Sequence, residues 1–354
     1  MMAPVIGEKF VFRLRLRLTT TVGQSVREEE MGMFRQFIAV LVPLMLSVAA
    51  AAAETPVLRI AVLEFGTVNW ELDTIKHHGL DAENGFEMQV QGVAGSSAAQ
   101  VAFQGGETDA IVSDWIWVAR QRAAGKDYVF IPYSRAVGGV MVPSSSPAQS
   151  LADLKGQKIG IAGGPLDKSW IILRAYAEQV HGMDLAAETE QVFGGAPLIY
   201  KAALGGDLGG AINFWHFQAK MEAAGMRSLI SVSEAAQTLG LDPETPLLGY
   251  VLKGEMLRDN PELVEGLARA SRGAKQLLAA DDAEWDRLRG RMKAKNDAEF
   301  EALKAGFRAG IPGPGSVDEA AASKLLSIMA RIGGSDLVGE ATELPKGLFV
   351  NIGS

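Results

Sequence analysis

Short apolar runs alternate with amphipathic stretches along the chain from Val57 onward. Runs such as VLRIAVL (Val57–Leu63) and KIGIA (Lys158–Ala162) have the length and the flanking turn residues of buried strands. The stretches between the runs carry apolar residues at helical spacing and end at glycine, as at Gly79 and Gly105. This alternation predicts an α/β fold in which helices flank mostly parallel sheets.

The same alternation predicts the bounds of the individual strands and helices. The predicted strands cover residues 57–63, 86–90, 109–112, 128–132, 139–142, 158–162, 189–193, 209–213, 227–232 and 245–252. The predicted helices cover residues 70–78, 98–104, 115–124, 169–180, 196–204 and 214–223, followed by one from 261 and by 281–291, 297–309 and 317–331.

The pattern of strands and helices restarts near residue 139, which indicates a second lobe. A length of 354 residues fits two such units at roughly 100–200 residues each. The helices that follow residue 252 need a sheet on which to bury their apolar stripes, and we expect them on the first lobe. Residues 54–137 and 247–354 are therefore predicted to form lobe I, and residues 138–246 to form lobe II, with two hinge crossings.

Residues 1–53 are predicted to be a doubtful leader followed by a secretory signal peptide. Arg35 precedes an apolar run that ends in small residues before Glu54, with cleavage expected near Ala53. The run is shorter than the roughly 20 residues of a spanning helix, which favours export over a retained anchor. Residues 1–30 carry Glu28 where a signal needs positive charge, and we interpret them as an upstream translation artefact. The mature protein is expected in the periplasm.

Composition excludes several classes of chemistry. The chain has 42 Asp+Glu against 34 Lys+Arg, a net charge of -8, which argues against a nucleic-acid partner. It has no cysteine, so disulfides, thiolate metal sites and cysteine nucleophiles are absent. Four histidines leave little for a histidine-rich metal centre. We predict no cofactor and no metal.

Three segments resemble a known family. AAQVAFQGGETDAIVSDW (98–115), SLADLKGQKIGIAGG (150–164) and DNPELVEGLARASRGAKQLLA (259–279) are similar to periplasmic substrate-binding proteins of ABC importers. The resemblance is to the nitrate/sulfonate/taurine (NitT/TauT) branch, which includes the thiamine-precursor, NMT1/THI5-like type. It implies a two-lobed flytrap of type II that closes on a small solute and presents it to ABC permease transmembrane subunits, here as a monomer. A related enzyme uses a cysteine-containing iron motif, which this chain cannot have.

Residues just past the predicted strand ends are the candidates for ligand contact. Ligands of open α/β sheets bind at the carboxyl ends of the strands, where helix N-termini point their N–H groups. Five of the six tryptophans fall there, which favours an aromatic cleft, and of Trp115 and Trp117 we choose Trp115. The candidate set is Glu64, Phe65, Asn69, Trp70, Ser96, Ser97, Asp114, Trp115, Tyr133, Gly164, Asp167, Ser169, Trp170, Asn213, Trp215 and His216.

The ligand class follows from the charges in this set. The acids Glu64, Asp114 and Asp167, together with the aromatic rings, favour an amine-bearing or heterocyclic solute over a sulfonate or nitrate anion. Ordinary helix capping is the competing explanation for Asp114 and Asp167. A solute-binding protein without enzymatic activity is the function we expect. The alternatives are a periplasmic accessory protein that binds a protein partner on the same fold, and a pyrimidine-precursor-related enzyme.

Overall fold

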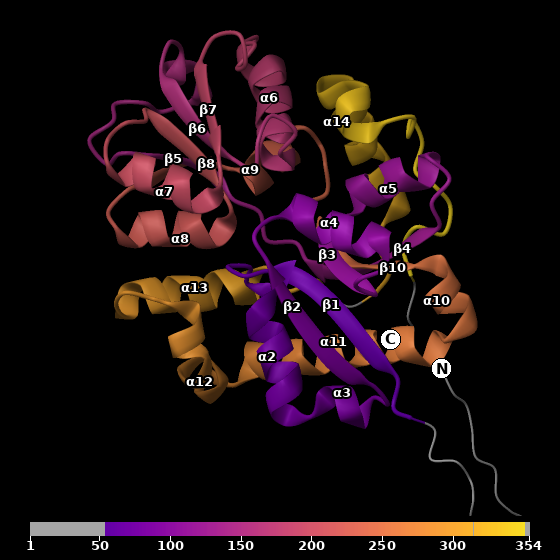
Figure 1. The fold of residues 1–354 in the computed structure, drawn as a ribbon. Coiled ribbons are helices and arrows are strands. Elements are labelled where there is room, and N and C mark those ends of the chain that lie inside the picture. The colour runs from indigo at the N-terminus through magenta and orange to yellow at the C-terminus, as the bar shows by residue number, and fades with distance from the viewer. Residues whose placement is uncertain (1–53, 314, 351–354) are drawn as a thin grey trace, which may run out of the picture. The chain divides into compact units, whose positions relative to one another are not determined.

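The computed structural model of the chain describes residues 54–313 and 315–350 (Figure 1). From Thr55 onward the described residues form one compact unit. The predicted leader and signal peptide lie outside the described residues. Within them, no helix has the length and apolar character needed to cross a membrane.

The first of two sheets has five strands in the order β2-β1-β3-β10-β4. β1 pairs in parallel with both β2 and β3, whereas β10 runs antiparallel to both β3 and β4. The bounds are β1 (Val57–Leu63), β2 (Glu87–Val93), β3 (Ala110–Asp114), β4 (Tyr128–Ser134) and β10 (Leu248–Lys253).

The second sheet repeats this topology in the order β7-β6-β8-β5-β9. β6 pairs in parallel with β7 and β8, and β5 runs antiparallel to β8 and β9. The bounds are β5 (Gly139–Val142), β6 (Lys158–Ala162), β7 (Glu190–Gly194), β8 (Gly210–Asn213) and β9 (Arg227–Ser231). In each sheet the antiparallel strand is the one that enters from the other lobe. The predicted two-lobed α/β fold with mostly parallel sheets is confirmed.

Helices flank both sheets (Figure 1). Several begin with side-chain caps, and many end at a glycine with positive φ, such as Gly79 after α2 and Gly182 after α6. Their bounds are α2 (Val68–His78), α3 (Leu80–Glu83), α4 (Ser96–Gly105), α5 (Trp115–Ala123), the 3-10 helix η1 (Leu151–Leu154), α6 (Lys168–His181), α7 (Ala196–Leu204), α8 (Trp215–Ala223), α9 (Val232–Thr238), α10 (Gly254–Asp259), α11 (Pro261–Ala280), α12 (Asp282–Met292), α13 (Asp297–Ala309) and α14 (Glu319–Val338).

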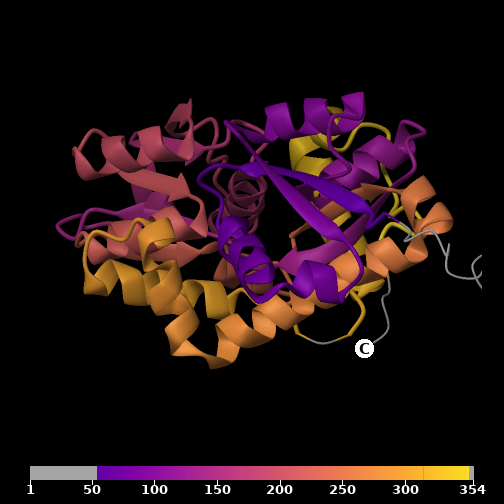
Figure 2. The ribbon, with the colours of Figure 1, turned by 60° about the horizontal axis from the view of Figure 1, so that its bottom comes forward.

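We expected the last helices to pack on the first lobe alone, but two of them also contact helices of the second lobe. α11 packs on α2 and α3 of the first lobe, but α13 packs on α8 and α14 packs on both α5 and α6. Figure 2 shows α11, α12 and α13 as a run of helices that leads from the first sheet to the second lobe. Lys220 Nζ of α8 lies 3.1 Å from the nearly buried Glu299 Oε1 of α13. α13 and α14 therefore both contact helices of the second lobe.

The chain passes between the sheets twice. One passage lies between Ser134 and Gly139, and the other between Ser231 and Leu248. Arg135 in the first passage forms an ion pair with Glu244 in the second. The predicted boundaries at 137/138 and 246/247 fall within these passages, and the assignment of whole segments to lobes stays a prediction.

Candidate functional site

A cavity of about 430 Å³ lies between the two sheets. Its wall includes residues that follow β1, β3, β6 and β8, and the first residues of α2, α4, α5, α6 and α8. Strand ends and helix starts meet there because parallel strands direct their carboxyl ends to one edge of a sheet and each following helix begins at that edge. Both lobes thus contribute helix N-termini to one enclosed space.

Nine of the sixteen predicted residues line the cavity. They are Phe65, Ser96, Ser97, Asp114, Tyr133, Asp167, Ser169, Trp215 and His216. The other seven do not line it: Glu64, Asn69, Trp70, Trp115, Gly164, Trp170 and Asn213.

Three of the seven serve the backbone or face away from the cavity. Asn69 Nδ2 donates to the carbonyls of Leu63 and Gly66 at 2.8 Å each, and thereby holds the turn after β1. Asn213 Nδ2 donates to the Ala196 carbonyl at 3.0 Å. Glu64 is exposed and lies close to Gly92. The two asparagines therefore stabilise local backbone structure, and ligand contact by Glu64 stays a prediction.

The tryptophans divide between the cavity and the core. Trp70, Trp115 and Trp170 are buried in hydrophobic clusters and do not line this cavity. Trp117 lines the cavity in place of Trp115, whose ring packs against Phe349. Trp117 and Trp215 are therefore the two tryptophans on the wall among the described residues. The position after a strand does not fix which way a side chain in the first helical turn points.

Helix N-termini dominate the polar part of the wall. α2, α4 and α8 begin without a side-chain hydrogen bond to their first N–H groups. Ser96 and Ser97 of α4 are exposed. Uncapped N–H groups and the positive end of the helix dipole attract negative charge.

The two other helix N-termini are each capped by an aspartate. Asp114 Oδ1 accepts a hydrogen bond of 2.8 Å from the backbone N–H of Trp117, and Asp114 Oδ2 lies 2.8 Å from Lys168 Nζ of the opposite lobe. Asp167 Oδ1 accepts a hydrogen bond of 3.0 Å from the backbone N–H of Trp170. Helix capping therefore accounts for part of what both aspartates do, and Asp114 also bridges the lobes.

The two aspartates differ in their ion pairing. Burial raises the pKa of Asp167 to about 6, against the opposing effects of the Trp170 N–H and of Lys168. The backbone N–H of Ser169 also acts on this carboxyl group and opposes the rise in pKa. No ion pair of Asp167 is present among the described residues, whereas Asp114 is paired with Lys168.

His216 is neutral in this structure. Burial, and to a smaller extent the charge of Lys220, lowers its pKa to about 3. Its Nε2 atom has no hydrogen-bond partner among the described residues. Because it has no hydrogen bond to a serine of the cavity, the two do not form a nucleophile–base pair.

A buried ion pair lies directly behind the cavity wall. Lys275 Nζ lies 2.7 Å from Glu71 Oε2, while Tyr250 and Ser271 donate to Glu71 Oε1 at 2.7 and 2.6 Å. Lys275 also lies 4.8 Å from the ring centre of Tyr133, which lines the cavity. Burial lowers the pKa of Lys275, and the ion pair with Glu71 opposes that change.

The candidate set does not include this network or seven polar or aromatic residues of the wall: Thr67, Gln100, Ser113, Trp117, Arg120, Lys168 and Phe214. Lys275 and Glu71 come from helices far apart in the chain, and no local pattern joins them. Lys168 and Trp117 both follow predicted strand ends, and Trp117 was left out because Trp115 was chosen in its place. Gln100 and Arg120 lie further along α4 and α5, beyond the reach of that rule.

Comparison with known proteins gives a consistent picture of the fold. The family model described as NMT1/THI5 like matches residues 75–284. No curated protein matches the chain significantly.

Solved structures of low sequence identity have the same fold. The alkanesulfonate-binding protein SsuA from Xanthomonas axonopodis pv. citri bound to MOPS is 19% identical with a TM-score of 0.62, over 84% of this chain and 97% of that one. The periplasmic aliphatic sulphonate binding protein SsuA from Escherichia coli is 17% identical with a TM-score of 0.63, over 80% of this chain and 94% of that one. A DszB mutant in complex with biphenyl-2-sulfinic acid is 16% identical with a TM-score of 0.53, over 83% of this chain and 98% of that one.

Proposed function

Because this chain belongs to the NMT1/THI5-like family, we propose that it is a periplasmic solute-binding protein that captures a small organic molecule between its lobes and passes it to an ABC-type permease. The observation that carries the proposal is the cavity of about 430 Å³, whose wall comes from both lobes. A site shared by two lobes suits a protein whose lobes close around a ligand. The predicted signal peptide supports export to the compartment where such a protein works.

The wall favours a ligand that carries both an acidic and an amine group. The uncapped start of α4, with the exposed Ser96 and Ser97, suits an acid group. The carboxylate of Asp167, which lines the cavity and has no ion-pair partner among the described residues, suits an amine. Trp117 and Trp215 supply apolar surface for the body of the ligand. This class keeps the amine that the sequence favours and adds an acid.

The neighbours support the acid group. One of them binds MOPS, which carries a sulfonate and a tertiary amine, and both SsuA proteins are described as sulfonate-binding. In this chain the Asp114 charge is paired with Lys168, so Asp167 is the carboxylate left for the amine. We therefore place 2-aminoethanesulfonate and MOPS first among the test ligands.

Calorimetric titration with matched compounds tests the ligand class. The wild-type protein is expected to bind 2-aminoethanesulfonate at least tenfold more tightly than either ethanesulfonate or ethylamine. Asp167→Asn keeps an oxygen to cap α6 and is expected to abolish the preference for the amine-bearing compound. Asp184→Asn is the matched control, because Asp184 accepts backbone hydrogen bonds in the second lobe and does not line the cavity.

Two results would contradict the proposal at different levels. Equal affinity for ethanesulfonate and 2-aminoethanesulfonate would refute the ligand class and leave solute binding intact. If neither these compounds nor a wider panel of amines, pyrimidines and organic acids shifts the thermal unfolding temperature, and a periplasmic protein binds, solute capture is refuted in favour of the accessory role.

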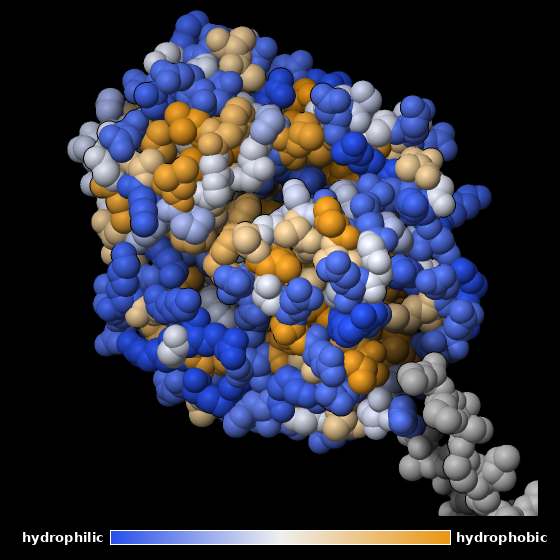
Figure 3. Space-filling model, viewed as in Figure 1, coloured by the Kyte–Doolittle hydropathy of each residue, from blue (hydrophilic) through white to orange (hydrophobic). Residues whose placement is uncertain are grey.

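Transfer of the solute requires a surface that meets the permease. Figure 3 shows apolar side chains on both lobes of one face. Among the exposed large apolar residues, Phe193, Leu198 and Leu204 belong to the second lobe and Val90 and Val101 to the first. Such residues on both lobes would let a membrane partner contact both at once.

A further inference from the structure

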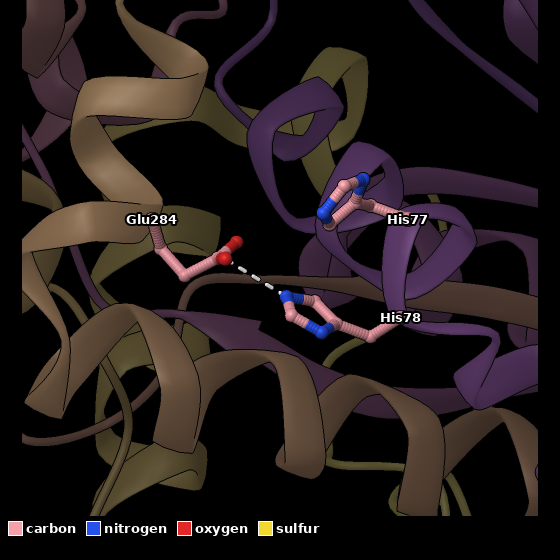
Figure 4. Close-up of side chains that lie close together, drawn as sticks. All are labelled: His77, His78 and Glu284. Carbon is pink, nitrogen blue, oxygen red and sulfur yellow. Dashed lines mark hydrogen bonds and ion pairs between the residues drawn. The ribbon is translucent and has the colours of Figure 1, made fainter.

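A histidine–glutamate cluster lies at the end of α2 that is remote from the cavity (Figure 4). His77 and His78 are the last residues of α2, and Glu284 lies in the first turn of α12. His78 Nε2 lies 2.8 Å from Glu284 Oε1, and the rings of His77 and His78 meet edge to face with centres 4.9 Å apart. One donor atom from each of the three residues lies within 4.8 Å of the others.

From this geometry we propose that His77, His78 and Glu284 form a surface site for a divalent transition metal ion of the Zn²⁺ class. Two imidazoles and one carboxylate are a ligand set that Zn²⁺ accepts, with a fourth position open to water. A bound ion would take the place of the proton that His78 and Glu284 share in the metal-free protein. A small rotation of the exposed His77 ring would complete the site.

The carboxylate is held in place by groups that leave one oxygen for the metal. Arg287 Nε and Nη2 donate to Glu284 Oε2 at 3.1 and 3.0 Å, so that Oε1 faces His78. Arg287 is itself bound to Asp73 and donates to Thr74 Oγ1 at 3.1 Å, both of α2. Partners of this kind orient ligating side chains and raise metal affinity.

The local charges suit a cation in spite of the nearby arginine. The buried Glu284 carboxyl group meets His78 at Oε1 and Arg287 at Oε2, so that each of its oxygens has a partner. Asp73 pairs with both Arg287 and Arg291 and offsets part of their positive charge. The negative end of the α2 dipole lies at His77 and His78, which also favours a positive ion.

Zn²⁺ titration of the protein tests the site. The protein is purified without a polyhistidine tag, stripped with a chelator and titrated with ZnCl₂ by calorimetry. The wild type is expected to bind one Zn²⁺ per chain. His77→Ala is expected to bind Zn²⁺ at least tenfold more weakly than the wild type. His181→Ala is the matched control, because His181 is the last residue of α6 and does not belong to this cluster. The Zn²⁺ affinity of this variant should equal that of the wild type.

A second measurement separates metal binding from loss of structure. His77 has no hydrogen bond among the described residues, so His77→Ala should unfold at the wild-type temperature without metal. Co²⁺ bound by nitrogen and oxygen ligands should give a visible absorption band in the wild type that is lost in His78→Ala. The proposal is overturned if the wild type binds no Zn²⁺, or if binding is unchanged in both His77→Ala and His78→Ala.

Discussion

The negative charge of Asp167 lowers the stability of the folded protein, because burial disfavours the ionised carboxyl group. Its carboxylate caps α6 from a desolvated position at the cavity, and its pKa of about 6 is well above the ordinary value of 3.8. A group whose pKa is raised by folding stabilises the fold when protonated, and that stabilisation is lost as the pH rises through the folded-state value. We therefore predict that Asp167→Asn, which keeps the cap and removes the charge, makes the ligand-free protein more stable at pH 8.

The magnitude follows from the shift in pKa. Each pH unit corresponds to about 1.4 kcal/mol, so a shift from 3.8 to about 6 gives a gain of about 3 kcal/mol in the free energy of unfolding at pH 8. The gain should fall to about half of that at pH 5 and to about a fifth at pH 4, because the wild-type side chain is then protonated in the folded state and partly protonated in the unfolded state. In a protein of this size the gain at pH 8 raises the unfolding temperature by several degrees.

Urea unfolding followed by far-UV circular dichroism at pH 4, 5, 6, 7 and 8 measures this difference. Asp184→Asn serves as the control, since it also changes a capping aspartate but in a loop away from the cavity. A variant that is less stable than the wild type at pH 8 would refute the reasoning, because the cap would then need the charge. A gain that does not change with pH would refute it as well.

Three further changes probe the wall of the cavity and its support. Trp70→Ala should lower the free energy of unfolding by about 3–5 kcal/mol, measured by urea titration, because the ring packs on Trp215, Trp285 and Phe307 in the core. Lys275→Met should cost about 3–5 kcal/mol in the same assay, since it leaves the Glu71 carboxylate buried without its cation, and a milder effect would contradict the buried pair. Gly306→Ala should weaken ligand binding in calorimetry, because an added Cβ would lie 2.6 Å from the Trp215 ring and displace it, whereas unchanged affinity would exclude that ring from the site.

The strands were predictable because glycine, proline and polar residues bound each apolar run. β1, β5 and β6 have the predicted limits, and the other strands differ by a few residues at their ends. The direction of β5 and β10 was not predictable, because it depends on how each strand enters a sheet from the other lobe. The short helices α3, α9 and α10 were also missed, since four to seven residues show too little periodicity for a helix to be recognised.

The cavity wall was predictable as a region but not residue by residue. The strand-end rule found Asp114 and Asp167, and it could not show that Lys168 of the opposite lobe neutralises one of them. It also counted Trp115 and Trp170 as wall residues, although the side chains of first-turn residues divide between the core and the cavity. Contacts between segments distant in sequence decide these questions, and a single sequence does not contain them.

The position of β4 in the first sheet has a consequence for the order in which the chain folds. β4 pairs with β10, and its residue Phe130 forms a β-bridge with Phe349. Both partners follow all strands of the second sheet in the sequence. During synthesis, β4 therefore has no strand partner until Leu248 and the residues beyond it have emerged. The first lobe is begun first and completed last, so a chain that stops before β10 would expose the unpaired edges of β3 and β4 to aggregation.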